Sequence, residues 1–110
     1  MKKVIISMGL AISTGSLMFN LSACHKAPSC DGTTPTYKDD ASLVLNKNCA
    51  LSGCHVAGFA NGDFSTYSGA VAKKDDIKSQ VVSKGMPPSG SLSDNDIQTI
   101  SCWVENGCPE

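Results

Sequence analysis

Two cysteines and a histidine stand close together in the segment CALSGCH, as Cys49, Cys54 and His55. Thiols and an imidazole at this spacing can support three kinds of chemistry. The two thiols can form a disulfide, which is the default in an oxidising compartment. Together with Cys102 or Cys108, the three side chains have the right types for a zinc site. The two thiols can also attach a cofactor covalently and leave the following imidazole free to bind its metal.

A further candidate ligand is Met86, which lies in the segment Gly85-Met86-Pro87-Pro88 and is the only methionine after residue 18. A lone methionine usually fills a gap in an apolar core. This one is poorly placed for helix packing, because a glycine precedes it and two prolines follow. Since proline fixes the backbone behind it, the pattern predicts a soft sulfur ligand on a stiff loop.

Short helices are expected to position these residues. Helical spacing of apolar residues predicts a first helix over 39–48 that runs directly into Cys49. Further short helices are expected near 66–72 and over 75–82. The segment 84–91, KGMPPSGS, cannot be helical because of its glycines and prolines.

The last helix has the clearest signals. Ser93 is the expected N-cap, and Asp96 three residues later completes a capping box. Gly107 is the expected stop. Apolar residues keep the helical period between these ends, namely Ile97, Ile100, Trp103 and Val104. Because no segment alternates as a strand would, the sequence predicts an all-α fold of three to five short helices.

The N-terminus predicts export. Lys2 and Lys3 precede an apolar stretch over 4–19 that contains several small residues, which is typical of a secretion signal rather than a membrane span. The segment 21–24, Leu-Ser-Ala-Cys, resembles the lipobox of bacterial lipoproteins, in which cleavage precedes a cysteine that is then acylated. An ordinary signal peptide, with Cys24 left for a disulfide, is the alternative.

The expected organisation is therefore a signal peptide over 1–23, a lipidated tether over 24–37 that begins at Cys24, and one domain over 38–110. The tether segment is rich in proline, glycine and hydroxyl residues and shows no apolar period. His25 stands where many lipoproteins carry an inner-membrane retention aspartate, which favours an outer-membrane anchor with the domain facing the periplasm.

Charge and size narrow the function further. The mature chain would carry seven lysines, no arginine and ten acidic residues, a formal charge of −3, with no basic patch. This composition argues against nucleic acid as a partner. A mature chain of 87 residues forms one small domain whose core is marginal without a disulfide, a metal or another insert.

The order of these features resembles a small class I cytochrome c domain of the bacterial monohaem type. The resemblance covers roughly residues 38–109 and rests on CALSGCH, on Met86-Pro87-Pro88, and on the terminal helix LSDNDIQTISCWVENG. It implies one covalent haem c. The departure from the family pattern is the spacing, with four residues instead of two between the cysteines.

Carried over residue by residue, the resemblance makes Cys49 and Cys54 the thioether attachments, His55 the proximal iron ligand and Met86 the distal ligand. The two extra residues within 50–53 must bulge outward, which Gly53 would permit. Tyr67 or Trp103 is an expected hydrogen-bond donor to a haem propionate. Histidine–methionine ligation suits electron transfer.

The resemblance therefore implies a membrane-anchored electron carrier, not itself an enzyme, that exchanges electrons with redox partner proteins. Two alternatives remain open at this point. One is a disulfide-stapled lipoprotein that acts as a binding or structural module. The other is a haem-based ligand sensor, which requires a labile bond to Met86.

If Cys24 carries lipid and Cys49 and Cys54 hold a cofactor, three cysteines remain, namely Cys30, Cys102 and Cys108. Three is an odd number, so one of them has no partner within the chain. If Gly107 ends the last helix in a left-handed conformation, Cys102 and Cys108 take positions that often touch in such a helix end. A Cys102–Cys108 disulfide is the favoured expectation. Cys30, just ahead of the domain, is the competing partner.

Overall fold

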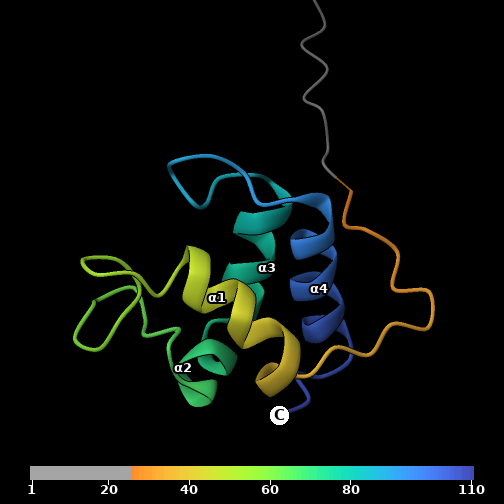
Figure 1. The fold of residues 1–110 in the computed structure, drawn as a ribbon, viewed down its shortest axis with the longest axis horizontal. Coiled ribbons are helices and arrows are strands. Elements are labelled where there is room, and N and C mark those ends of the chain that lie inside the picture. The colour runs from red at the N-terminus through yellow and green to blue at the C-terminus, as the bar shows by residue number, and fades with distance from the viewer. Residues whose placement is uncertain (1–25) are drawn as a thin grey trace, which may run out of the picture.

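The computed structural model describes residues 26–110, and this part of the chain is helical without strands (Figure 1). A π-helical turn, η1, continues directly into α1, and three further α-helices follow. Their bounds are η1 Tyr37–Ala41, α1 Ser42–Asn48, α2 Tyr67–Ala72, α3 Lys74–Val82 and α4 Asp94–Glu105. The all-α prediction is confirmed for these residues, as are the expected helices near 66–72 and 75–82.

The first helix begins two residues earlier than the sequence predicted. Thr36 is its N-cap, and the Thr36 hydroxyl oxygen accepts a hydrogen bond from the Asp39 amide at 3.2 Å. The Asp40 carboxylate in turn accepts from the Thr36 amide at 2.9 Å. The Ala41 amide donates a hydrogen bond to the Thr36 carbonyl, and this bond produces the π turn. At the other end, Cys49 is the C-cap, so the helix delivers the cysteine motif as expected.

Helix α4 begins and ends as predicted. The Ser93 hydroxyl oxygen accepts a hydrogen bond from the Asp96 amide at 3.1 Å. At the C-terminus Gly107 has φ +85°, and the Cys108 amide donates to the Trp103 carbonyl at 2.9 Å. The Gly107 amide donates to the Val104 carbonyl, which completes a Schellman motif.

The favoured Cys102–Cys108 disulfide is wrong: the structure pairs Cys102 with Cys30, the competing partner named from the sequence, with a Cα–Cα distance of 5.4 Å. The Schellman motif does form, with the Cys108 amide donating to the Trp103 carbonyl, but the Cys102 sulfur is already bonded to Cys30. Cys108 is a buried free thiol, whereas Cys102 is turned toward the N-terminal segment.

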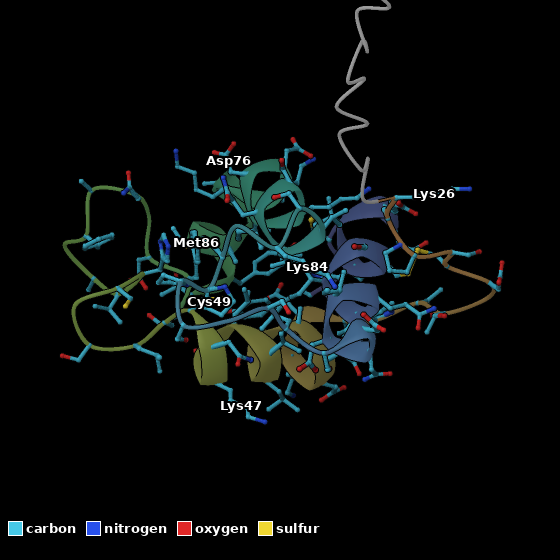
Figure 2. All side chains as sticks on the ribbon, turned by 90° about the horizontal axis from the view of Figure 1, so that it is seen from above. Lys26, Lys47, Cys49, Asp76, Lys84 and Met86 are labelled. Carbon is cyan, nitrogen blue, oxygen red and sulfur yellow. A yellow bond between two sulfur atoms is a disulfide. The ribbon has the colours of Figure 1, made fainter. Side chains whose placement is uncertain are left out.

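The N-terminal segment over 26–36 packs along α4 instead of acting as a free tether. The Gln98 side-chain amide donates to the Ser29 carbonyl at 2.8 Å, and the Asn106 side-chain amide donates to the Thr33 carbonyl at 3.0 Å. This segment lies on the far side of α4 from Met86 and Cys49 (Figure 2). The described part of the expected tether is thus fastened to the domain beside the Cys30–Cys102 disulfide.

Two sequence predictions fall on residues that the structure does not describe. The signal peptide over 1–23 and the lipidation residue Cys24 lie outside 26–110. Within the described residues, no helix has the length and apolar character to cross a membrane.

The core forms where α4 meets α3 and η1. Trp103, Ile100, Leu45 and Val81 are fully buried. The Tyr37 ring lies 5.9 Å from the Trp103 ring, measured between centroids, so the first helical segment packs on the last one. This core holds α1 and α3 in place, and the cavity that forms the candidate site lies between these two helices.

We expect Gly69→Ala to lower the free energy of unfolding by about 1–3 kcal/mol, as overpacking does in close-packed interiors. A Cβ atom at Gly69 would overlap the backbone oxygen of Asp63, which cannot rotate away as a side chain could. Urea unfolding followed by circular dichroism measures the change. Ser68→Ala, at an exposed neighbour on α2, is the control. Equal stability of the two variants would contradict this close approach.

Candidate functional site

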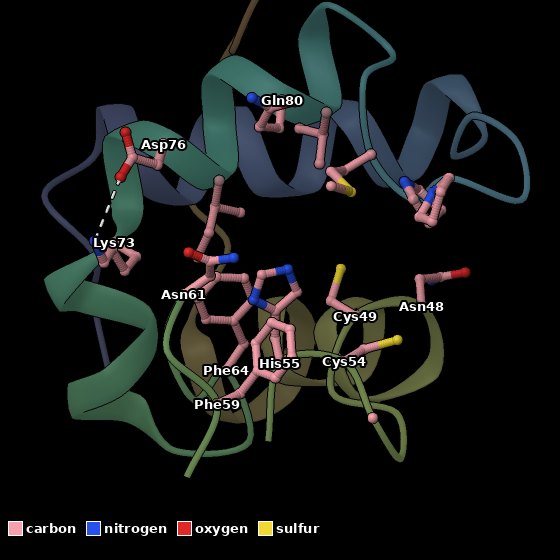
Figure 3. Close-up of a pocket in the computed structure, with 16 residues that line it drawn as sticks. Asn48, Cys49, Cys54, His55, Phe59, Asn61, Phe64, Lys73, Asp76 and Gln80 are labelled. Carbon is pink, nitrogen blue, oxygen red and sulfur yellow. Dashed lines mark ion pairs between the residues drawn. The ribbon is translucent and has the colours of Figure 1, made fainter. Parts of the chain in front are cut away.

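A cavity of about 450 Å³ opens between two walls (Figure 3). The end of α1 and the loop over 49–64 form one wall. Helix α3 and the loop over 83–88 form the other. This volume lies within the usual range for small-molecule and cofactor sites.

All four residues that the sequence singled out line this cavity: Cys49, Cys54, His55 and Met86. The first three come from the loop that follows α1, and Met86 comes from the loop that follows α3. Figure 3 shows Cys49, Cys54 and His55 together on one wall. The fold therefore brings a methionine from a distant part of the chain to the same cavity as the cysteine motif.

The cysteine motif folds with the outward bulge that its spacing requires. Gly53 adopts φ +77°, and the Cys54 amide donates to the Leu51 carbonyl at 2.8 Å, which closes a tight turn. The His55 amide then donates to the Cys49 carbonyl at 3.1 Å. Leu51, Ser52 and Gly53 are exposed. Leu51 and Ser52 thus lie outside the cavity lining, while Gly53, both cysteines and the histidine line it.

Aromatic rings fix the plane of His55. Its imidazole stacks on the Phe64 ring, with centroids 4.1 Å apart and an interplanar angle of 9°. Phe59 meets the imidazole edge-on at 5.5 Å. The Phe64 amide also donates to the His55 carbonyl at 2.9 Å. This pair was not predicted from the sequence, although both phenylalanines lie within nine positions of His55 in a chain with few aromatic residues.

The His55 Nδ1 atom is buried and has no hydrogen-bond partner among residues 26–110. A buried polar atom left in this way costs about 1–3 kcal/mol, so such atoms often mark sites where a bound group changes the ring's environment. The imidazole is therefore ordered by stacking but is not held through Nδ1 by any group in the described part of the chain. This state fits a histidine whose role is to bind a cofactor metal.

A second Schellman motif positions Met86. Lys84 takes the left-handed position with φ +61°, and the Gly85 amide donates to the Gln80 carbonyl at 2.9 Å. The Met86 amide donates to the same carbonyl at 3.3 Å. The Met86 side chain is 39% exposed, at the mouth of the cavity. The loop is thus anchored directly to the end of α3, which supports the stiffness that the sequence predicted.

Burial raises the pKa of the Cys49 thiol to about 11, and the nearby Cys54 thiol adds to the shift. The thiolate is the form that attacks disulfides and oxidants. A raised pKa therefore keeps Cys49 protonated at neutral pH and slows its oxidation. Neither Cys49 nor Cys54 is paired with another described cysteine.

The pKa of Cys49 predicts an alkaline loss of stability in the protein without cofactor. Below pH 9 the thiol is protonated in both the folded and the unfolded chain. Between pH 9 and pH 11 only the unfolded chain loses its proton, so the free energy of unfolding falls, by at most about 2–3 kcal/mol.

Urea unfolding at pH 8 and pH 11 measures this loss, which we expect Cys49→Ala to reduce. Tyr37 and Cys108, whose pKa values burial also raises, account for the loss that remains. Cys54→Ala should keep most of the loss, because burial is the larger cause at Cys49. An identical pH dependence in the wild type and in Cys49→Ala would contradict the assignment.

The zinc alternative gains no support from the geometry. Cys102 is held in its disulfide with Cys30. Within residues 26–110, no group of three or more histidine, cysteine or acidic side chains is placed to hold a metal ion. The site consists instead of two thiols, one imidazole and one thioether distributed around a cavity large enough for an organic group.

The donor set fits a haem. Two thiols can hold the cofactor by thioether bonds, and an imidazole and a thioether sulfur are both established axial ligands of haem iron. The apolar residues Ile77, Val81, Phe64 and Pro87 line the same cavity, as a flat apolar ring requires.

Comparisons of this chain with protein-family models, with curated proteins and with solved structures found no match.

Proposed function

We propose that this protein is a membrane-anchored, monohaem c-type cytochrome with a class I-like domain, and that it carries single electrons. The main observation that supports this proposal is that Cys49, Cys54, His55 and Met86 line one cavity, although Met86 lies in a separate loop. Cys49, Cys54 and His55 are neighbours in the sequence, so the support comes from Met86, which the fold brings to their cavity from a separate loop.

In this proposal each residue has a defined task. The Cys49 and Cys54 thiols would each add across a vinyl group of the haem, so that S–H would become S–C and C–H and nothing would leave. His55, held flat against Phe64, would bind the iron through its imidazole. Met86 would supply a sulfur ligand. The bound haem contributes an iron that gains and loses one electron.

The electron would pass at the mouth of the cavity. Met86 and Phe59 are each 39% exposed there, so a redox partner protein can approach the haem edge closely. Because two protein ligands would fill both axial positions, the proposal gives the chain no catalytic site of its own. This is why we propose a carrier rather than an enzyme.

Separate observations support the proposed location. The Cys30–Cys102 disulfide supports an oxidising compartment, since such bonds are rare in the cytosol. The lipobox at 21–24 supports a lipid anchor at Cys24, with the domain facing the periplasm. In this proposal the chain joins the membrane through acyl chains, with the outer membrane favoured.

A haem stain after denaturing electrophoresis tests the proposal. The full chain is expressed with a bacterial haem-attachment system, and its band is expected to stain because covalent haem survives denaturation. Deleting Leu51 and Ser52 converts CALSGCH to CAGCH, which has the regular two-residue spacing, and this variant is the positive control.

The outcomes separate the candidate functions. A colourless wild type with a Cys49–Cys54 disulfide would overturn the proposal in favour of a stapled binding or structural module. A stained protein that lacks the iron–methionine absorption band would instead favour a haem-based ligand sensor. A stained protein with that band supports the electron carrier.

A further inference from the structure

The cavity has two chemically different ends. Figure 3 shows Cys49 and Cys54 toward one end, and Lys73 and Asn61 toward the other. All four of these residues line the cavity. The cysteine end is where thioether attachment would take place, and it also carries the Asn48 amide. The opposite end carries the Lys73 amine, the Asn61 amide and the Asp76 carboxylate, so the lysine cation is what distinguishes it (Figure 3).

This polarity matches the chemistry of a haem, so the inference rests on the proposed function. The two vinyl groups of a haem lie on the side of the porphyrin away from its two propionate carboxylates. Fixing the vinyl groups at Cys49 and Cys54 therefore directs the propionates toward the other end of the cavity. Lys73 is the only lysine among the described residues that line it, and no arginine does so.

Lys73 is free to take a new anionic partner. Its amine lies 3.8 Å from the Asp76 carboxylate, and the two side chains are 43% and 77% exposed. An exposed ion pair at this distance contributes little, because water and salt screen it. Exchanging Asp76 for a carboxylate that is held in the cavity would therefore cost little.

The side chain of Lys73 is nevertheless well placed. Lys73 lies at the junction of α2 and α3, where it is both the C-cap of one helix and the N-cap of the next. Its stem lies over Gly62: a Cβ atom built there would sit 3.1 Å from the Lys73 Cγ and 2.9 Å from the Phe64 Cε1. The lysine stem thus runs beside the ring that stacks on His55.

The donors that the sequence suggested are occupied elsewhere. The Tyr67 hydroxyl donates to the Cys108 carbonyl at 2.8 Å, and the Trp103 indole N–H donates to the Pro109 carbonyl at 3.0 Å. Neither residue is part of the cavity lining. The structure therefore gives no support to either residue as the propionate donor.

We infer that Lys73, assisted by the Asn61 amide, binds a propionate carboxylate of the haem and so fixes the end of the cofactor remote from Cys49 and Cys54. Asp76 is the other charged group at this end of the cavity. Its negative charge opposes a propionate, so the lysine must turn from Asp76 toward the cofactor when haem is bound.

Lys73→Met in the haem-loaded full chain tests this inference, because methionine keeps the length of the side chain and removes its charge. Two quantities are measured: the propionate bending band in resonance Raman spectra and the midpoint potential. We expect the band to move and the potential to fall, since an unpaired propionate stabilises the oxidised iron. Lys73→Arg should restore both values toward those of the wild type.

Lys74→Met is the matched control. Lys74 is the next residue, has similar exposure and pairs with Asp75 at 3.2 Å, but it does not line the cavity. Its loss should leave the propionate band unchanged. A Lys73→Met protein whose band and potential equal those of the wild type overturns this inference alone. A wild type without covalent haem overturns the proposed function as well.

Discussion

Met86→Leu is expected to abolish the iron–methionine absorption band while the haem stays covalently attached. Leucine preserves the volume of the side chain, but it has no sulfur to bind iron. The midpoint potential should fall by a few tenths of a volt, within the roughly 0.8 V range over which axial ligands set haem potentials. Visible spectra and redox titration of the purified protein measure both effects.

Leu43→Ala provides the control for this experiment. Leu43 is 64% exposed on α1 and is absent from the cavity lining, so its loss should change neither the band nor the potential. If Met86→Leu retained the band at its original strength, another residue would have to be the distal ligand. Met86 would then be an ordinary exposed side chain.

Removing the Cys30–Cys102 disulfide is expected to lower the free energy of unfolding by about 2–5 kcal/mol. The bond joins residues separated by 72 positions and so closes most of the domain into one loop. It also fastens the N-terminal segment to α4 beside the bonds from Gln98 and Asn106. Urea unfolding of the Cys30→Ala/Cys102→Ala double variant measures the loss.

Reductant supplies an internal control. Dithiothreitol should destabilise the wild type by a similar amount, but it should have no further effect on the double variant. Cys108→Ala should keep the full sensitivity to reductant, because Cys108 is a free thiol in this structure. A Cys108 variant that had lost this sensitivity would restore the Cys102–Cys108 pairing that the sequence suggested.

Local signals in the sequence predicted much of the fold. The Ser93 cap and the Gly107 stop are determined by residues close to them in the chain, and both appear in the structure as expected. The outward bulge of CALSGCH also follows from local chemistry, since Gly53 alone in the motif readily adopts a positive φ.

The errors concern contacts between distant segments. Cys30 meets Cys102 only because the N-terminal segment runs along α4, and nothing near Cys30 in the sequence signals that path. Composition suggested a flexible tether there, but side-chain amides from α4 hold the backbone at Ser29 and Thr33. A turn-rich composition occurs both in free linkers and in segments that are bound to a domain, so composition alone does not distinguish the two.

In the candidate site, too, some features could be predicted from the sequence and others could not. Cys49, Cys54, His55 and Met86 could be chosen from residue type and spacing, and the structure places them on one cavity. The polar end of that cavity could not be predicted, because Lys73 reaches it only through the junction of α2 and α3. An exposed lysine beside an aspartate looks like ordinary surface until the cavity is known.

Peptide mass spectrometry of the purified exported protein is the most direct test of covalent haem attachment. We expect the peptide containing residues 49–55 to carry the mass of one haem, bound through both Cys49 and Cys54. The Cys49→Ala/Cys54→Ala variant should lack this mass. If the wild-type peptide contained only free thiols or a disulfide, while the shortened CAGCH variant gained haem in the same cells, the proposed function would be contradicted.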